Sequence, residues 1–402
     1  MTNLPQGWEV KTLSEIGEIV TGSTPSKSNL DFYGKDYPFF KPSDFEQGYF
    51  LENAGDNLSK LGFGKARQLP PKTILVVCIG SLGKVALTKV IGSCNQQINA
   101  IIPHKNIISE YIYYYCISSK FQSILFSKAP QTTLAILNKT EFSKLEIIYP
   151  KDIKEQERIV GILDFAFSKI DENIKKAKEN LANIDELMQS ALQKAFNPLN
   201  DNTKENYQLP QSWEWKSLGD TSNYGKTSQV KPSQLKGNDC LELEDIEKES
   251  GVLLQKVLFQ DRQSKSNKIK FNKGDILFGT LRPYLKKVII ADDNRACSSE
   301  IMPFSTGNSI TNHFIYYYLF ANFLHDRISS LTYGARMPRL GTKDGKSLQI
   351  PLPPLQEQEQ IAEHLDFVFE KAKALKELYT KELKDYEELK QSLLDKAFKG
   401  EL

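Results

Sequence analysis

Basic side chains gather in one short stretch near the end of the chain, among glycines and a proline. The stretch YGARMPRLGTKDGK (333–346) contains Arg336, Arg339 and Lys343. Arginine presents a planar fork of donors that matches guanine or phosphate, lysine neutralises phosphate charge, and glycine lets a backbone approach closely. A solvated basic loop would explain the composition more simply. We favour contact with DNA, because groove and phosphate contacts require this combination.

Two turns between apolar runs carry further cations. TILVVCIGSLGKVAL (73–87) and DILFGTLRPYLKKVII (275–290) are rich in Val, Ile, Leu and Phe and are broken by glycine. This pattern is typical of two buried strands joined by a turn. Lys84 lies in the first predicted turn, and Arg282 and Lys286 lie in the second.

Polar loops supply the remaining candidates. GSTPSKSNLDFYG (22–34) and its counterpart YGKTSQVKPSQLKG (224–237) have turn-forming compositions, and each carries lysines. Residues 128–150 and 333–354 each resemble a loop followed by a final strand. Arginine suits guanine and glutamine suits adenine, whereas lysine more often contacts phosphate. The candidate DNA contacts are Ser23, Thr24, Lys27, Lys84, Gln131, Thr132, Thr133, Arg282, Lys286, Arg336, Arg339 and Lys343.

Two long helices are predicted to position these loops. No Gly or Pro interrupts the chain between Leu355 and Phe398, and its apolar residues alternate at spacings of four and three, as in a coiled-coil seam. At about 1.5 Å per residue, this helix would be on the order of 65 Å long. Residues 152–196 repeat the design, so each seam has a partner within the chain. The predicted seam residues are Ile159, Leu163, Ile170, Ile174, Leu181, Ile184, Ile361, Leu365, Val368, Leu375, Tyr379 and Leu393.

The chain is a tandem duplication with an offset of about 202 residues. Glu-Gln-Glu recurs at 155–157 and 357–359, Leu-Asp-Phe at 163–165 and 365–367, and Lys-Ala-Phe at 194–196 and 396–398. Trp8 and Trp213 begin the matching globular segments, where we expect them to anchor each start to its core. IYYY at 112–115 and 315–318 is better explained by core packing than by stacking on bases.

This organisation also separates charge. The globular segments 1–150 and 209–351 carry 15 Lys and Arg against 12 Asp and Glu (+3) and 20 against 15 (+5). The helix with its linker, 151–208, carries 9 against 11 (−2), and the C-terminal helix, 352–402, carries 8 against 12 (−4). The asymmetry suggests that a polyanion binds the globular segments only.

No motif indicates catalysis or a metal. GxxxxGK[ST], GxSxG and HExxH are absent, as is a Gly-rich turn for S-adenosylmethionine. Asn197-Pro198-Leu199 lacks the second Pro and the aromatic of the Asn-Pro-Pro-aromatic motif of adenine methyltransferases, so we regard it as coincidence. The acids Glu242, Glu244 and Asp245 are expected in a surface run without basic partners. The four histidines share no metal-ligand spacing.

The remaining composition indicates an ordinary cytoplasmic chain. Five cysteines without a CxxC pair suggest buried, reduced thiols. No apolar run of about eighteen residues exists, so no membrane span is expected. The start MTNLPQGWEV lacks the basic and apolar regions of a secretion signal.

The two LP-x-x-W openings, each variable globular segment followed by a long helix, and the strings PLPPLQEQEQIAEHLD and KAFKGEL together resemble the specificity subunit of type I restriction–modification systems. The resemblance covers nearly the whole chain. The first helix departs slightly, since YPKDIKEQERI lacks the proline run of the second.

The resemblance implies an α+β chain of two α/β target recognition domains separated by two antiparallel coiled-coil helices with pseudo-twofold symmetry. Each domain would read one half of a split site in double-stranded DNA, and the helices would set the gap between the halves. The resemblance further implies two methyltransferase subunits that carry S-adenosylmethionine and flip the target adenine, with a restriction subunit in systems that have one. This chain itself would be non-catalytic and bind no cofactor.

Two rival interpretations remain open at this point. One is a duplicated coiled-coil scaffold whose basic faces bind protein or RNA, which the acidic helices alone would suit. The other is a fragment of a self-contained restriction enzyme, which would need methyltransferase motifs that the sequence lacks. The matched lysine-bearing loops and the strings at both helix ends favour the specificity subunit.

Overall fold

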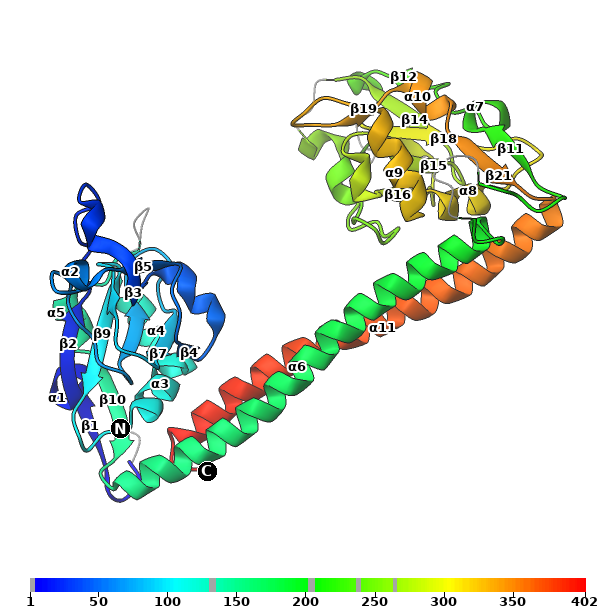
Figure 1. Ribbon diagram of the computed structural model, residues 1–402. Coiled ribbons are helices and arrows are strands. Elements are labelled where there is room, and N and C mark those ends of the chain that lie inside the picture. The colour runs from blue at the N-terminus through cyan, green and yellow to red at the C-terminus, as the bar shows by residue number, and fades with distance from the viewer. Residues whose placement is uncertain (1–3, 130–134, 202–206, 236–239, 263–265) are drawn as a thin grey trace. The chain divides into compact units, whose positions relative to one another are not determined.

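The computed structural model describes residues 4–129, 135–201, 207–235, 240–262 and 266–402. The chain forms two compact units (Figure 1). Unit 1 comprises Met1–Ala177 and Lys381–Leu402, and unit 2 comprises Lys178–Thr380. Both units contain helices and strands, so the mixed α and β content agrees with the prediction.

Unit 1 is built on a five-stranded sheet of order β2-β9-β6-β7-β4. Its strand β6 is apolar throughout because Ile74 and Val76 lie in one hydrophobic core and Leu75 and Val77 lie in another. A three-stranded sheet of order β5-β3-β8 lies beside it, with β3 and β8 parallel. The strands are β2 (Gly17–Thr21), β3 (Tyr33–Phe40), β4 (Phe50–Leu51), β5 (Asp56–Leu58), β6 (Ile74–Val77), β7 (Val85–Thr88), β8 (Ser93–Cys94) and β9 (Ile98–Pro103). The short helices are α1 (Leu13–Ile16), η1 (Leu30–Phe32), η2 (Pro42–Gln47), α2 (Lys60–Phe63), α3 (Ser109–Ile117), α4 (Ser119–Lys128) and α5 (Lys139–Ser143).

Unit 2 repeats the buried strand and the parallel pair. Ile276 and Phe278 of β15 lie in one core and Leu277 lies in another, and β13 runs parallel to β17 as β3 does to β8. The sheets have the orders β16-β15-β18 and β12-β14-β17-β13. The strands are β12 (Ser228–Val230), β13 (Cys240–Leu241), β14 (Lys268–Phe271), β15 (Ile276–Gly279), β16 (Val288–Ile290), β17 (Arg295–Cys297), β18 (Ile301–Phe304), β19 (Thr332–Tyr333) and β20 (Arg339–Leu340). The short helices are α7 (Leu218–Thr221), η3 (Pro232–Gln234), η4 (Leu243–Asp245), η5 (Phe259–Arg262), η6 (Pro283–Leu285), α8 (Asn312–Tyr318), α9 (Asn322–Leu331) and α10 (Thr342–Lys346).

A two-stranded ribbon joins the start of each globular segment to its end. β1 (Trp8–Thr12) pairs antiparallel with β10 (Glu146–Pro150), and β11 (Glu214–Ser217) pairs with β21 (Gln349–Leu352). Trp8 packs against the unit 1 core and Trp213 is buried, as the anchoring prediction requires. Each ribbon ends just before a long helix begins.

The repeated tyrosines are core residues, which confirms the preferred interpretation over base stacking. Tyr114, Tyr115, Tyr317 and Tyr318 are all buried. The Tyr114 hydroxyl donates to Asp164 at 2.6 Å, and the Tyr317 hydroxyl donates to the matching Asp366. The same bond therefore ties each core to the first turns of a long helix.

The long helices are α6 (Ile153–Phe196) and α11 (Leu355–Ala397), close to the predicted bounds. The middle residue of each Glu-Gln-Glu string is fully buried. Gln156 accepts a hydrogen bond from the Ile108 amide at 2.9 Å and donates to the Pro150 carbonyl at 2.9 Å. Gln358 accepts from the Thr311 amide at 3.0 Å and donates to the Pro353 carbonyl at 2.8 Å. Each glutamine thus fixes a helix start on its own unit.

Within each unit the two long helices lie side by side and run in opposite directions. In unit 1, Arg158 donates to an oxygen of Leu402 at 2.8 Å and Lys390 to Asp171 at 2.6 Å. In unit 2, Ile184 and Met188 pack with Ala372. The predicted seam residues Ile159, Leu163, Ile170, Ile184 and Leu365 are buried, and Ile174, Leu181, Ile361, Val368, Tyr379 and Leu393 are half-buried.

Leu375 was wrongly assigned to the seam. Its side chain is 42% exposed, whereas Lys376 is half-buried and pairs with Asp185. An α-helix repeats every 3.6 residues, so a strict alternation of four and three drifts away from the contact line over several turns.

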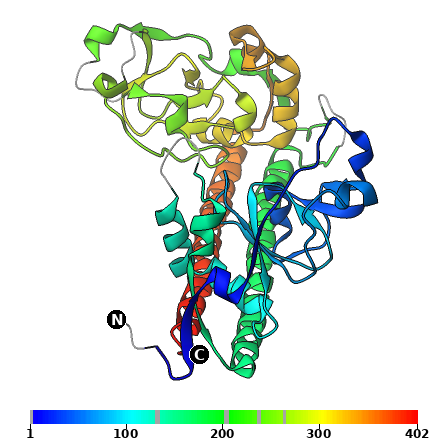
Figure 2. The ribbon, with the colours of Figure 1, turned by 90° about the vertical axis from the view of Figure 1, so that its left-hand side faces the viewer.

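The chain's two ends meet in unit 1. Gly400 lies so close to Pro5 that a side chain at position 400 would collide with the proline ring. Figure 2 shows the start of the chain and the end of α11 (red) near one another. Among the described residues, no helix is long and apolar enough to cross a membrane. All five cysteines are buried and free, and burial raises the pKa of Cys78 and Cys94 to about 12.

Candidate nucleic-acid interface

Backbone pairing brings three candidate arginines together in unit 2. The Arg282 amide donates to the Pro338 carbonyl at 2.7 Å, and the Leu340 amide donates to the Thr280 carbonyl at 2.9 Å. The turn after β15 thus lies along the β19–β20 hairpin, in which Tyr333 is opposite Arg339. Figure 1 shows this hairpin (orange, labelled β19) projecting from the body of unit 2. We call Arg282, Arg336 and Arg339 the arginine strip.

The side chains of the strip are available for a partner. Arg282 and Arg336 are exposed and Arg339 is half-buried. Among the residues that the structure describes, no carboxylate pairs with these guanidinium groups, whereas Arg262 and Arg295 are both paired. Lys343 is exposed on α10, a few residues beyond Arg339. Unpaired exposed arginines form a site for phosphate or for guanine edges.

Lys286 does not belong to this surface, and its prediction as a DNA contact was wrong. It is only 6% exposed, and its ammonium group donates to the Asn322 side chain on α9. Burial lowers its pKa. The Asn322 side chain that holds this lysine lies 36 residues further along the chain, so the local pattern gives no sign of its burial.

The backbone of the turn is strained where its counterpart in unit 1 is relaxed. Arg282 has φ 50° and ψ 56°, and Lys286 has φ 46° and ψ 46°, both in the left-handed region. The equivalent turn of unit 1 uses Gly80 and Gly83 for its positive φ angles. A left-handed residue with a side chain costs on the order of 1–2 kcal/mol, and glycine avoids this cost. Arg282 thus occupies a position at which glycine would be less strained.

Unit 1 has the same backbone arrangement with different side chains. The Gly80 amide donates to the Ala135 carbonyl at 3.2 Å, and Ile79 bridges Ile136 as Leu281 bridges Arg339. Gln97 donates to the Ile79 carbonyl at 3.4 Å. The neighbouring Gln96 accepts from Thr24. The structure therefore brings the polar loop at 22–34 to the same surface as the turn.

Two residues of this surface were missed from the sequence. Arg67 donates its amide to the Ser23 hydroxyl at 3.3 Å and its guanidinium to the Thr21 carbonyl at 2.6 Å. Gln96 holds Thr24, as described above. Gln96 lies in a stretch without cations, so only the fold reveals it. Arg67 directly follows Gly62, Gly64 and Lys65, a basic and glycine-containing stretch that could have indicated it.

The other unit 1 candidates differ in their availability. Lys27 is exposed. Lys84 donates to Glu46, and this bond holds the pKa of Glu46 below its usual value. Such an exposed pair is weak, so a phosphate can compete for the lysine. Gln131, Thr132 and Thr133 lie outside the described residues.

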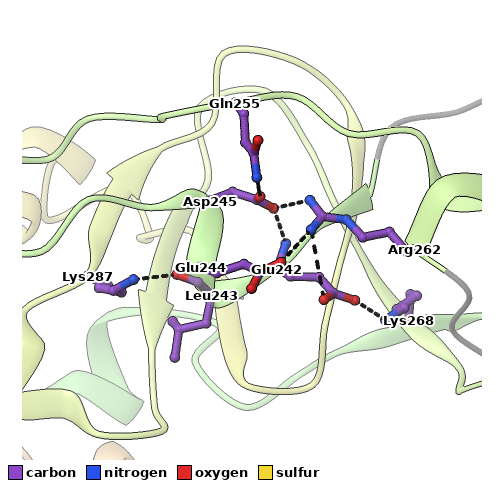
Figure 3. Close-up of polar contacts among 8 residues, drawn as sticks. All are labelled: Glu242, Leu243, Glu244, Asp245, Gln255, Arg262, Lys268 and Lys287. Atoms are coloured by element: carbon purple, nitrogen blue, oxygen red, sulfur yellow. Dashed lines mark hydrogen bonds and ion pairs between the residues drawn. The ribbon is translucent and has the colours of Figure 1, made fainter. Parts of the chain in front are cut away.

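The acidic run at 242–245 was wrongly expected to lack basic partners (Figure 3). Asp245 is fully buried, pairs with Arg262 and accepts from Gln255 at 2.9 Å. Glu242 accepts from the buried Lys268 at 3.0 Å. The partners are distant in sequence, and buried charges require such pairing. The network is structural. Within the described part of the chain, no group of three or more His, Cys, Asp or Glu could hold a metal ion.

The fold is that of a duplicated α/β protein, and the arginine strip of unit 2, unpaired among the described residues, suits contact with a polyanion. The family model for the type I restriction modification DNA specificity domain matches residues 5–183 and again 210–384. The chain therefore belongs to this family and carries the domain twice.

Individual relatives agree with the family match. The type I restriction enzyme HindI specificity subunit of Haemophilus influenzae is 39% identical over 42% of this chain and 38% of that protein. The MjaIX specificity subunit of Methanocaldococcus jannaschii is 29% identical over 54% and 52%. In both cases the chain covers about half or less of the relative's length. The EcoDI specificity subunit of Escherichia coli is 23% identical over 99% of this chain and 89% of that protein.

Solved structures share the fold. One chain, from a structure of complex assembly and conformational transition of the type I R-M system, has a TM-score of 0.79 at 19% identity and full coverage of both chains. The HsdS subunit from Thermoanaerobacter tengcongensis has a TM-score of 0.55 at 20% identity, covering 99% of this chain and 98% of that one.

Proposed function

We propose that this chain is the non-catalytic DNA sequence-specificity subunit of a type I restriction–modification complex. Residues 1–150 and 209–351 act as target recognition domains, and each reads one half of a bipartite site. The main support for this proposal is that the same backbone arrangement presents different side chains in the two units. Unit 1 has Gly80 and Ile136 where unit 2 has Arg282 and Arg339. A backbone arrangement that both units share, with different side chains on it, suits the recognition of two different half-sites.

The long helices act as the spacer in this proposal. They form an antiparallel coiled coil that gives the chain a pseudo-twofold axis. Their uninterrupted lengths of 44 and 43 residues and their opposed directions within each unit support this role. Since B-DNA repeats roughly every 34 Å, helix length then sets the number of unread base pairs between the half-sites.

Two methyltransferase subunits dock on the chain and carry S-adenosylmethionine, and the complex works in the cytoplasm. Large apolar residues that the core leaves exposed occur at matching positions of the duplication. Phe165 and Phe367 are 69% and 59% exposed, and Leu187 and Leu389 are also exposed. The support for this part of the proposal is the recurrence of the same exposed residues 202 positions apart, one set on each long helix. Two equivalent sets support two copies of one partner.

Adenine-methylation mapping tests the proposal. DNA is compared from cells with and without this gene, with its neighbours intact. We expect one split motif to lose its methylation without the gene, and we expect exchange of residues 209–351 for those of a relative to change only one half. An expressed system whose methylation does not depend on the gene would contradict the proposal and favour the scaffold that binds protein or RNA.

A further inference from the structure

The tip of the β19–β20 hairpin exposes large apolar side chains. Tyr333 is 60% exposed and Met337 is 54% exposed. Gly334, with φ 92°, allows the chain to reverse between them. Neither side chain belongs to a hydrophobic cluster of unit 2. The hairpin therefore presents two large side chains, Tyr333 and Met337, to solvent.

The charges beside the tip select the kind of partner. Arg336 and Arg339 lie on either side of Met337 in the sequence, and Arg282 is held against the same hairpin. The described residues supply no carboxylate partner to these arginines. The hairpin therefore combines an apolar tip, formed by Tyr333 and Met337, with unpaired cations beside it. Double-stranded DNA matches this pattern, because its surface is anionic and its interior consists of stacked apolar rings.

We propose that the β19–β20 hairpin is a wedge that opens a base step of the half-site read by residues 209–351. Met337 enters between neighbouring bases, Tyr333 stacks on an exposed base, and the arginine strip holds the flanking phosphates and base edges. This inference rests on the proposed function, since it requires that unit 2 binds duplex DNA. It adds a distortion of the DNA to the reading of base edges.

The wedge gives the exposed Tyr333 and Met337 of the hairpin a function. Proteins that kink DNA insert Met, Leu, Phe or Pro side chains between base steps and accept the cost of unstacking. Aromatic side chains stack on any base, because every base has a flat apolar face. An opened step also makes a neighbouring nucleotide easier to rotate out of the duplex, since part of its stacking is already lost.

The test uses DNA that is already unstacked at one position. The complete complex of this chain with its methyltransferase subunits is titrated with duplexes carrying its methylated motif. One abasic residue is moved a position at a time through the half-site. We expect Met337→Ala to bind the intact duplex about tenfold more weakly, because the buried methionine contribution is lost. At one abasic position, the variant should return to within about twofold of the unaltered complex.

Leu254→Ala is the matched control, since Leu254 is 58% exposed in the same unit and lies outside the hairpin. It should bind every duplex as the unaltered complex does. Equal binding of the intact duplex by Met337→Ala would overturn the wedge, and so would weaker binding that no abasic position restores. Loss of a methyltransferase subunit from the variant on size-exclusion chromatography would overturn it too and assign the hairpin to a protein partner. An unaltered complex without preference for the motif would instead reject the proposed function itself.

Discussion

The amide of Arg282 donates to the carbonyl oxygen of Pro338 at 2.7 Å, so a backbone bond fixes the turn after β15 against the β19–β20 hairpin. The same bond joins Gly80 to Ala135 in unit 1. Because the support consists of main-chain atoms, the side chains on it can change without altering the arrangement. Substitutions in the arginine strip should therefore alter DNA recognition more than folding.

Arg339→Ala should relax the sequence preference at one position of the site. If the guanidinium makes two bonds to a base, its loss costs roughly 1–3 kcal/mol of binding. Methylation mapping of cells with the variant would show additional bases accepted at that position. Lys248→Ala, a change of an exposed lysine outside the strip, is the control. An unchanged motif in the Arg339 variant would reject the base contact.

Arg282→Gly should make the chain more stable and weaken its recognition of the DNA motif. Glycine relieves the left-handed backbone and should raise the free energy of unfolding by up to about 1 kcal/mol. Methylation of the motif should fall at the same time. Urea unfolding and a methylation assay measure the two effects.

Glu249→Gly is the matched control for Arg282→Gly, because Glu249 is exposed, has φ 58° and lies outside the strip. It should raise stability without reducing methylation. If Arg282→Gly stabilises the chain and leaves methylation intact, Arg282 has no part in recognition.

Phe165→Ser and Phe367→Ser should each remove one methyltransferase subunit, and the double variant should remove both. Each change deletes an exposed aromatic from one of two matched positions. Light scattering of the purified complex would report the mass. Phe126→Ser, at a phenylalanine of α4 that is 51% exposed, should leave the mass unchanged. A double variant that retains both subunits would place the docking surface elsewhere.

Unit 2 should lose stability as the pH falls from about 6.5 towards 4. Burial lowers the pKa of His325 to about 4, although a hydrogen bond with the Leu319 carbonyl acts in the opposite direction and Lys286 and Asp326 lie nearby. The unfolded chain binds a proton below pH 6.5 that the folded chain does not, so folding is disfavoured there by up to about 3 kcal/mol.

His325→Gln removes this proton uptake. Unfolding experiments between pH 7.5 and 4.5 should therefore give a shallower loss of stability for this variant than for the unaltered chain. The exposed His364→Gln should keep the full dependence. Identical slopes for all three proteins would show that His325 does not carry the effect.

Helices and strands were predictable where the local spacing of apolar residues determines the secondary structure. The helices α6 and α11 were expected from their long uninterrupted periodicity, and the strands β6 and β15 from short apolar runs bounded by glycine. The duplication also predicted the paired tyrosine cores. The exposure of Leu375 was not predictable from an ideal repeat, because the line of contact shifts along a real helix.

The site was only partly predictable because long-range geometry decides which cations face outward. Arg282, Arg336 and Arg339 could be named from composition, but their contact through Pro338 could not. Lys286 resembles them in sequence but is buried and held by Asn322 of α9. The pairs of Asp245 with Arg262 and of Glu242 with Lys268 join residues far apart in the sequence, so the local sequence shows acids alone.

Gly400 lies against Pro5, so a short loop could join these two parts of the chain. If a short loop joined the two ends and the chain were cut after the exposed Leu199, the new protein would begin with the second globular segment and finish with α6. Its order of segment, helix, segment and helix would be unchanged. Each globular segment would still be followed by a long helix, so the order of the two halves along the chain does not determine this fold.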